Sequence, residues 1–170
     1  RCWVDEKILR RKISNEGNLI WALSFHNEDR ANIEKILVDK QDNLIVFGSY
    51  YGYLNVDPRG PTIINMQFTS GNDRSFIAKY DKQGKMIWYF TFKASSWNVY
   101  TYDAVLDKDD NIIFTGTWAN LLSIGGKSIS SIRESAFVAK LKGNDGSFLW
   151  VKKLTSSREN TLVKLTLLNN

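Results

Sequence analysis

The sequence has 170 residues, of which 43% are hydrophobic, 24% charged and 13% aromatic. This balance is that of an ordinary globular protein and excludes a disordered chain. The many aromatic residues, and the lack of runs rich in Ala, Leu and Glu, favour strands over helices. The net charge of +5 comes from basic residues that, outside 7–12, are scattered among acidic ones. Such a pattern indicates a solvated surface, so we expect no nucleic-acid partner.

Cys2 is the only cysteine in the sequence, which excludes an internal disulfide and a zinc site built from cysteines. No run approaches the roughly 18 apolar residues of a membrane span, and no secretory signal with an apolar centre opens the sequence. Because the first residue is Arg rather than Met, we expect a processed or truncated polypeptide whose true termini lie elsewhere.

Three tryptophans mark an internal repeat. Trp21, Trp88 and Trp150 are separated by 67 and 62 residues, and each stands four residues after a glycine. The three glycines are Gly17, Gly84 and Gly146. A period of this length indicates one supersecondary unit that is used several times.

The first unit, at 8–32, is incomplete. Strands are predicted at 8–13 and 19–25 around the turn at 14–17, and 27–32 is predicted to be a polar loop. In the second strand Trp21, Leu23 and Phe25 fall on one face, which is the periodicity of a strand.

The first complete unit, at 33–92, contains four predicted strands. They lie at 33–38, 44–48, 75–80 and 86–92, with a turn at 39–43 and a long connection at 50–74. The apolar run at 44–47 does not alternate with polar residues. A strand with this pattern is buried on both faces, so a second surface must cover the sheet.

The second complete unit, at 101–154, repeats this order. Strands are predicted at 102–106, 112–116, 136–141 and 148–154, with a turn at 107–111 and a loop at 117–135. Residues 38–48 and 106–116 match at a constant offset of 68. A further unit is predicted to begin at 160–170, where Asn169 falls in the place of Asp39 and Asp107.

The repeated motifs resemble a known family. The pattern Asp-Lys-x-Asp-Asn-(Ile/Leu)-Ile-x-x-Gly, followed by Phe-(Ile/Val)-Ala-Lys and Gly-x-x-(Ile/Leu)-Trp, resembles the bacterial β-propeller repeat that is often named after seven-bladed propellers. Asp42 and Asp110 stand where that family usually has Gly, and Asp tolerates the same left-handed backbone conformation. That repeat occurs in many secreted or surface proteins, so the resemblance implies an extracellular, cell-surface or periplasmic location.

A second resemblance involves the same residues. The pattern Ala-x-x-Asp-x-x-Gly-x-x-x-Trp, which ends at Trp88, is similar to the tryptophan-docking motif of quinoprotein-type propellers. Those proteins include quinone-dependent dehydrogenases and outer-membrane assembly factors, so the motif implies an architecture and no particular activity.

Together these patterns predict an all-β chain that forms part of one β-propeller domain. We expect complete four-stranded antiparallel blades at 33–92 and 101–154 and partial blades at 8–32 and 160–170. Propellers use about 4 to 8 blades. We therefore expect the remaining blades to come from a longer polypeptide or from other chains.

The candidate chemical groups predict no catalytic residue, metal site or cofactor. Asp107, Asp109 and Asn111 have the opening spacing of a calcium loop, but the Gly and distal Glu of an EF-hand are absent, which favours a hairpin turn. His26 is the only histidine and is predicted to be a loop residue. No Gly-x-Ser-x-Gly, His-Glu-x-x-His or phosphate-loop motif occurs.

Residues that recur at the same place in successive units are predicted to be structural. A catalytic lysine would be needed once, whereas a repeated lysine can lie along apolar surface or pair with an acid on the neighbouring blade. The structural set consists of Trp21, Trp88, Trp150, Lys79, Lys140, Gly84, Gly146, Asp39 and Asp107.

Aromatic residues that do not recur are the candidate ligand-binding residues: Tyr51, Tyr53, Trp97 and Trp118. Such side chains can stack on sugars or anchor a protein partner, although packing within the blades is an alternative role. We predict a non-enzymatic binding or scaffolding module that contacts a protein or a surface glycan through 50–74 and 117–135. A quinoprotein-type oxidoreductase or a propeller-containing sugar-active enzyme is the alternative. These would need a bound quinone or a pair of acids, and neither can be identified in the sequence.

Overall fold

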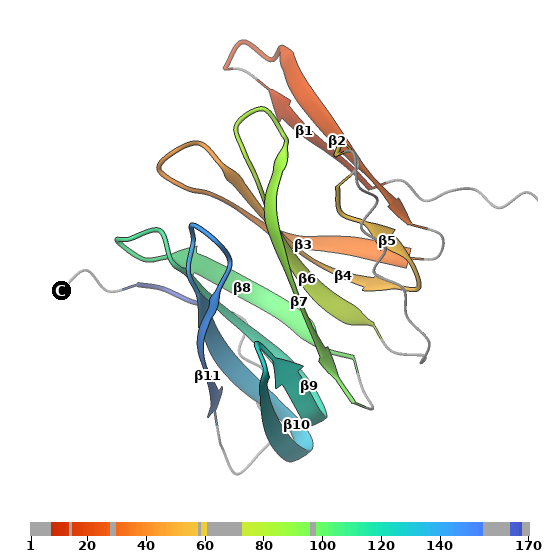
Figure 1. The fold of residues 1–170 in the computed structure, drawn as a ribbon, viewed down its shortest axis with the longest axis vertical. Helices are drawn as coiled ribbons and strands as arrows, with labels where there is room; N and C mark the ends of the chain where they lie inside the picture. The colour runs from red at the N-terminus through yellow and green to blue at the C-terminus, as the bar shows by residue number, and fades with distance from the viewer. Residues whose placement is uncertain are drawn as a thin grey trace, which may run out of the picture.

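The computed structural model describes residues 8–13, 15–27, 30–57, 59–60, 73–95, 98–154 and 164–167. Within these ranges all regular secondary structure is β-strand, and the strands form a row of antiparallel sheets (Figure 1). No helix in the described ranges is long and apolar enough to cross a membrane. The chain is all-β, as predicted.

Each of the two complete units is a four-stranded antiparallel sheet, here called the first and the second blade. The first blade pairs its strands in the order β3 (Arg30–Val38), β4 (Leu44–Tyr51), β6 (Arg74–Tyr80) and β7 (Met86–Ala94). The second blade pairs β8 (Tyr100–Leu106), β9 (Ile112–Ile124), β10 (Lys127–Leu141) and β11 (Phe148–Leu154). This arrangement is that of a β-propeller segment.

The partial unit that precedes the first blade is a hairpin. Its strands are β1 (Ile8–Ile13) and β2 (Leu19–Asn27), and the short strand β5 (Leu54–Asn55) adds to the edge of β2. His26, which the sequence predicts in a loop, pairs with Asn55 in this sheet. The strand extends beyond its predicted end because β5 supplies a partner for its last residues.

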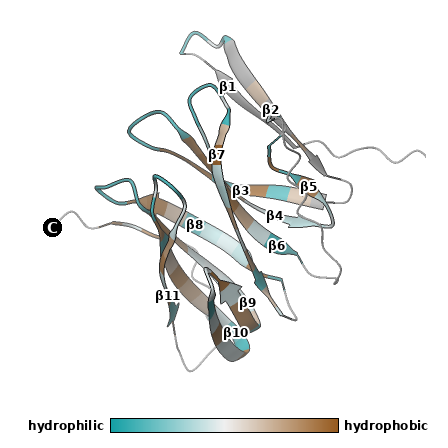
Figure 2. Cartoon of the chain, viewed as in Figure 1, coloured by the Kyte–Doolittle hydropathy of each residue, from teal (hydrophilic) through white to brown (hydrophobic). Residues whose placement is uncertain are grey.

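The cores lie between neighbouring sheets. One cluster joins the first blade to the second, with Phe92 and Phe114 in contact at a ring-centroid distance of 5.5 Å. The other joins the first blade to β2 and β5, where Phe25 contacts Phe76 and Tyr80. The predicted cover over both faces of 44–47 is therefore confirmed. Figure 2 shows that polar residues concentrate at the turns.

The tight turns have the conformation that the sequence predicts. Asp42 and Asp110 adopt positive φ angles of 63° and 57°. In each turn an aspartate carboxylate holds the backbone, as where Asp39 accepts hydrogen bonds from the amides of Gln41 and Asn43, each at 2.9 Å. These bonds replace backbone pairings that the turn cannot make.

Residues 117–135 are not the loop that the sequence predicts. They form the outer half of a long hairpin, in which β9 continues to Ile124, turns at Gly125 and Gly126, and returns as β10 from Lys127. Much of this hairpin is exposed, so its strands and turn carry Ser, Asn and Gly residues that are also typical of loops. Its strands persist because they pair with each other.

The connection between the second and third strands of each blade also pairs with the preceding sheet. In the first blade this connection is β5, whose Leu54 pairs with Asn27 of β2. In the second blade it is the long hairpin, whose Leu122 pairs with Ala94 of β7. Leu54 and Leu122 are both buried. Each connection therefore links its blade to the previous sheet through backbone hydrogen bonds.

The two ends of the blades differ. One end carries the short turns at 39–43, 81–85, 107–111 and 142–147, and the other end carries the longer connections (Figure 1). The β9–β10 hairpin and β5 both belong to the second group. The short turns and the longer connections are thus collected at opposite ends of the propeller segment.

Residues 164–167 are described without an assigned strand. Their position is fixed at one point, where the backbone N–H of Leu165 donates to the carboxylate of Asp103 at 2.8 Å. The rest of 160–170 lies outside the described residues, so the start of a further blade there stays a prediction.

Candidate functional site

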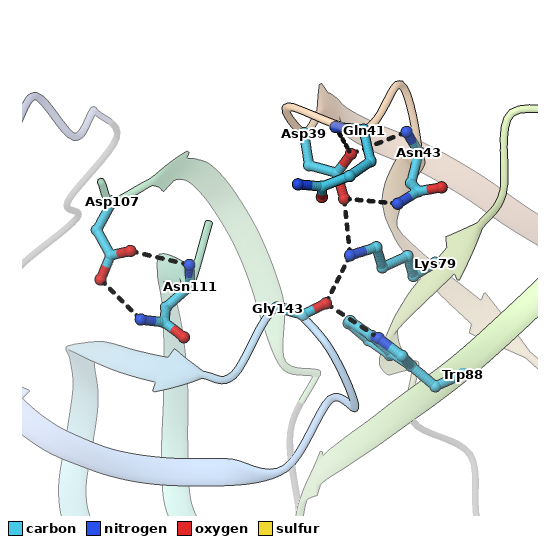
Figure 3. Close-up of polar contacts among 8 residues, drawn as sticks. All are labelled: Asp39, Gln41, Asn43, Lys79, Trp88, Asp107, Asn111 and Gly143. Carbon is cyan, nitrogen blue, oxygen red and sulfur yellow. Dashed lines mark hydrogen bonds and ion pairs between the residues drawn. The ribbon is translucent and has the colours of Figure 1, made fainter. Parts of the chain in front are cut away.

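A buried polar joint connects the first blade to the second (Figure 3). The ammonium of Lys79 lies 2.7 Å from the carboxylate of Asp39 and donates to the carbonyl oxygen of Gly143 at 2.6 Å. Asp39 is in the first turn of the first blade, whereas Gly143 is in the last turn of the second. Both charged groups are buried, so the pairing satisfies groups that would be costly to leave alone.

Trp88 completes this joint. Its indole N–H lies 3.3 Å from the same carbonyl oxygen of Gly143, and its side chain is 8% exposed. The ring packs on Gly146, where a Cβ atom would stand 2.7 Å from ring carbon. The recurring Lys79 and Trp88 of the first blade therefore contact the last turn of the second blade, which contains the recurring Gly146.

The second blade carries the same groups in a different state of burial. Lys140 lies 2.7 Å from the carboxylate of Asp107, and Asn111 also donates to that carboxylate. Burial by itself would raise the pKa of Asp107, but the hydrogen bonds from Lys140 and Asn111 outweigh it and lower the pKa to about 2. Trp150 on β11 pairs with Lys140 on β10, just as Trp88 on β7 pairs with Lys79 on β6. Trp150, however, is only half-buried.

The other residues of the predicted structural set are described mainly by their backbone conformation. Gly17, Gly84 and Gly146 all have positive φ angles. Trp21 lies in β2, and its side chain is outside the described part of the chain. The predicted hairpin turn at Asp107 is confirmed, since its N–H donates to the carbonyl of Asn111 at 2.9 Å.

The first strands of the two blades carry a second link between blades. Lys35 and Asp103, which are 68 residues apart, form an ion pair at 2.7 Å. Burial would raise the pKa of Asp103, but the hydrogen bonds from Lys35 and Leu165 outweigh it and lower the pKa. The same position is occupied in successive units by Lys35, by Asp103 68 residues later and by Leu165 62 residues after that.

Glu34 also lies at the boundary between the two blades. It is the extra residue of a β-bulge, because the register of β3 shifts between Ile33 and Lys35. Burial raises the pKa of its carboxyl from 4.5 to about 7, although hydrogen bonds to the Ser49 side chain and the Thr101 backbone lower it. One oxygen, Oε2, is buried without a hydrogen-bond partner in the described structure. The sequence held no signal for this residue beyond a charge within a strand.

Among the candidate aromatic residues, Trp118 is in the core and only 1% exposed. Its ring contacts Phe137 edge-on at 5.9 Å, and its indole N–H has no hydrogen-bond partner in the described residues. This burial is that of a side chain packed within the blade, which is the alternative role given above. Tyr51 and Tyr53 are half-buried, and Trp97 lies outside the described residues.

The end with the long connections holds two hollows that share two residues, Asn120 and Ile132. A pocket of about 490 Å³ is lined by Tyr100, Trp118, Arg133, Glu134 and their neighbours. A second hollow of about 550 Å³ lies beside Leu121 and Lys153. Ile132 lines both of them and is 98% exposed. Sequence reasoning missed Ile132 because it treated 117–135 as a loop and singled out aromatic residues.

The described residues offer no arrangement for metal chemistry, since no three His, Cys, Asp or Glu side chains are grouped among them. The polar clusters that do occur serve turns and joints between blades.

The sheets and joints define the chain as a segment of a β-propeller. No protein-family model matches the sequence. Over 121 residues the chain is 28% identical to the "Uncharacterized WD repeat-containing protein L264" of Acanthamoeba polyphaga mimivirus. The match covers 64% of this chain and only 9% of that protein's length. It agrees with a propeller-type repeat, whereas the bacterial repeat family and the quinoprotein-type motif are not confirmed and stay predictions.

Proposed function

We propose that this chain is part of a propeller-type module that binds another protein, and that the β9–β10 hairpin makes the central contact. The observation that carries this proposal is Ile132, an aliphatic side chain that is 98% exposed between two hollows. Scattered exposed apolar residues are common. The core of a protein interface is apolar, however, and an aliphatic side chain beside two hollows can be buried there by a partner.

The surroundings of Ile132 fit a protein partner. Leu121 is 40% exposed and lines the same hollow as Ile132, which extends the apolar surface. Arg133 and Glu134 line the neighbouring pocket and supply charges of both signs. An apolar centre with a charged rim is typical of an interface between proteins.

The hairpin that carries this surface is held to its neighbours by hydrogen bonds. The outer half of the hairpin is anchored to the first blade where Ser123 and Leu122 pair with Lys93 and Ala94. At its base, the ammonium of Lys153 donates to the carbonyl of Ser130 at 3.0 Å. Preorganised surfaces bind with less loss of conformational entropy.

A surface glycan is the other ligand class that the sequence suggests. Its support is weaker because the Trp118 ring is buried, which leaves the half-buried Tyr51 and Tyr53 as the described aromatic candidates. The similarity to a WD repeat-containing protein supports the propeller-type repeat, and the exposed apolar surface around Ile132 is what favours a protein partner. An extracellular, cell-surface or periplasmic location remains part of the proposal on the resemblance of the repeat alone.

The test is capture of partners from the native source by the wild-type chain and by Ile132→Asp. We expect the aspartate to reduce binding at least tenfold, because it places a charge at the centre of the interface. Ile87→Asp is the matched control, since Ile87 is 45% exposed on β7 next to a short turn. Binding should survive that change.

Two results would contradict the proposal. Equal binding by Ile132→Asp and wild type would remove the hairpin from the interface. Loss of binding in Tyr51→Ala with Tyr53→Ala, together with capture of a glycan, would favour the sugar-binding alternative.

A further inference from the structure

A row of polar side chains crosses the link between the first blade and the β9–β10 hairpin. Lys93 of β7 pairs with Ser123 of β9, and Ser123 pairs in turn with Ser128 of β10. Side chains directly opposite one another in antiparallel strands point to the same face of the sheet. Ala94 and Leu122, the neighbours of Lys93 and Ser123 along these strands, are buried in the core between the blades. The polar row therefore lies on the face that points away from that core.

A hollow of about 320 Å³ opens beside this row. Three cationic side chains line it, those of Arg74, Lys93 and Lys127. Three hydroxyl groups, including those of Ser123 and Ser128, and the two glycines of the β9–β10 turn also line it. No carboxylate is among the described residues that line this hollow. We call it the basic hollow, and its charge favours a negatively charged ligand.

The two lysines of the basic hollow are exposed, and neither forms an ion pair with an acid in the described part of the chain. The lysines that link strands and blades elsewhere, by contrast, each lie 2.7 Å from an aspartate carboxylate. Arg74 is half-buried and hydrogen-bonds the Tyr50 hydroxyl. Lys93 and Lys127 can therefore bind an anion directly, while Arg74 adds positive charge to the hollow.

The turn at the basic hollow presents backbone groups. Gly125 and Gly126 have positive φ angles of 55° and 74°, and a glycine can line a hollow only with its backbone atoms. A Cβ atom on Gly125 would overlap the Phe148 ring, so only glycine lets the turn pack this closely. The N–H groups at the centre of a two-residue hairpin turn lie outside the strand ladder. Successive N–H groups in a turn can form a concave site for an anion.

The donors of the basic hollow specify the class of anion. A carboxylate carries one negative charge on two oxygens, which is less than these cations and hydroxyl groups can satisfy. A phosphate monoester carries a charge of about −1.5 to −2 at pH 7 and has three acceptor oxygens. The hollow has the volume of roughly ten water molecules at about 30 Å³ each. A phosphate group therefore fits, with room for part of the molecule that carries it.

The corresponding link between the first blade and the preceding hairpin has different groups. There His26 and Asn55 take the places of Lys93 and Ser123, and β5 is only two residues long. A structural feature of the repeat is expected at both links. In the described residues the groups of the basic hollow occur at one of the two, which sets them apart from the residues that join the blades.

We propose that the basic hollow is a binding site for a phosphate group, taken either as the free ion or as a monoester of a small molecule. Lys93 and Lys127 pair with the phosphate oxygens, and the amides of Gly125 and Gly126 donate hydrogen bonds to them. The site differs from the surface around Ile132 and does not depend on the proposed binding of a protein partner.

The experiment is a titration of the isotope-labelled 170-residue chain with inorganic phosphate and with phenyl phosphate, at constant pH and ionic strength. NMR spectra follow the backbone amides of Gly125 and Gly126, with Gly84 in a short turn as the internal reference. We expect saturable shifts for the first two amides and none for Gly84. Tighter binding of phenyl phosphate assigns the site to a monoester, and tighter binding of inorganic phosphate assigns it to the free ion.

Substitutions test the two lysines. Lys93→Gln and Lys127→Gln should each weaken binding about two- to fivefold, as expected for an exposed ion pair. The double variant should weaken it about tenfold. Lys85→Gln is the matched control, because Lys85 is exposed in the short turn at 81–85, and this variant should bind as the wild type does.

Three results would overturn the proposal. The first is the absence of saturable shifts at Gly125 and Gly126 with either phosphate compound. The second is an equal response to sodium acetate, which would show attraction of any anion. The third is unchanged affinity in the double variant. Both of its substituted positions are exposed, so its melting temperature should match that of the wild type.

Discussion

Leu54 and Leu122 occupy the same place in successive blades, and each pairs with a residue that lies six positions after a tryptophan of the preceding sheet. The partners are Asn27, after Trp21, and Ala94, after Trp88. The two connections differ in length and sequence, yet they make the same link. The repeat therefore includes the edge contact between sheets as well as the four strands of each blade.

The first prediction concerns these two leucines, whose side chains are fully buried. Leu54→Ala and Leu122→Ala should each lower the free energy of unfolding by about 2 to 4 kcal/mol, because each leaves a cavity at the junction of two sheets. Leu121→Ala is the matched control on the exposed side of the same strand and should change it by less than about 0.5 kcal/mol. Chemical denaturation measures all three. Equal losses for Leu121 and Leu122 would contradict the assigned register.

The sequence predicts the strands well where the two units agree. Of the eight strands predicted in the two units, six lie within a few residues of the observed bounds, and the exceptions are the two strands of the long hairpin. The strand at 44–48 is predicted to be buried on both faces because its apolar residues are consecutive, and it is. These features depend on local patterns that each strand carries within itself.

The sequence does not predict the features that depend on distant partners. Residues 118–131 have loop-like composition and become strands because they pair with each other and with β7. Trp118 has no repeated counterpart, which made it a candidate ligand contact, but its ring packs against Phe137 in the core and is buried. Ile132 has no signal in the sequence, since its exposure follows from its place at an irregularity in β10.

The second prediction concerns Gly146, which has a φ angle of 70° and contacts Trp88. Gly146→Ala should lower the free energy of unfolding by about 2 to 4 kcal/mol, because the methyl group would overlap the indole ring in addition to the strain of a positive φ. Gly126→Ala is the control. Gly126 has a similar φ of 74°, but an added methyl group would meet no other atom there. Only the backbone strain of a positive φ then applies, which costs about 1 kcal/mol.

Thermal unfolding followed by circular dichroism measures this difference. Tryptophan fluorescence gives a second readout, because displacement of the Trp88 ring from Gly146 should shift the emission of the protein while Gly126→Ala leaves it unchanged. Equal destabilisation by the two alanines would show that the contact between Gly146 and Trp88 contributes nothing to the joint.

The third prediction uses Glu34, whose pKa burial raises from 4.5 to about 7. A carboxyl with a raised pKa in the folded state favours folding below its unfolded pKa, and this contribution is lost as pH rises from about 4.5 to about 7. Glu34→Gln stays neutral at every pH and should therefore be more stable than wild type at pH 8. At pH 4, where both side chains are neutral, the two proteins should have similar stability.

The measurement is the melting temperature of both proteins between pH 4 and pH 8. The melting temperature of the wild type should fall below that of Glu34→Gln as pH rises through this window, and the difference in the free energy of unfolding should reach about 1 to 3 kcal/mol at the upper end. Parallel curves would show that Glu34 ionises in the folded state as it does in the unfolded state.

The last prediction concerns Asp107, whose pKa is lowered to about 2 because the hydrogen bonds from Lys140 and Asn111 outweigh the effect of burial. A lowered pKa stabilises the folded state above the unfolded value of about 3.8, and the contribution is lost as pH falls toward 2. Solvent reaches this pair, so the contribution at pH 7 should be about 1 kcal/mol. Asp107→Asn should remove it while keeping an oxygen that accepts hydrogen bonds from the turn.

The stability difference between wild type and Asp107→Asn should therefore be present at pH 7 and shrink steadily below pH 4. Asp109→Asn, in the same turn with an exposed side chain, controls for the loss of one negative charge. Lys140→Met should reduce the pH dependence at Asp107, because the strongest of the bonds that lower its pKa is then absent. If the difference at pH 7 persists undiminished at pH 2, the ion pair between Asp107 and Lys140 does not account for the stability of this turn.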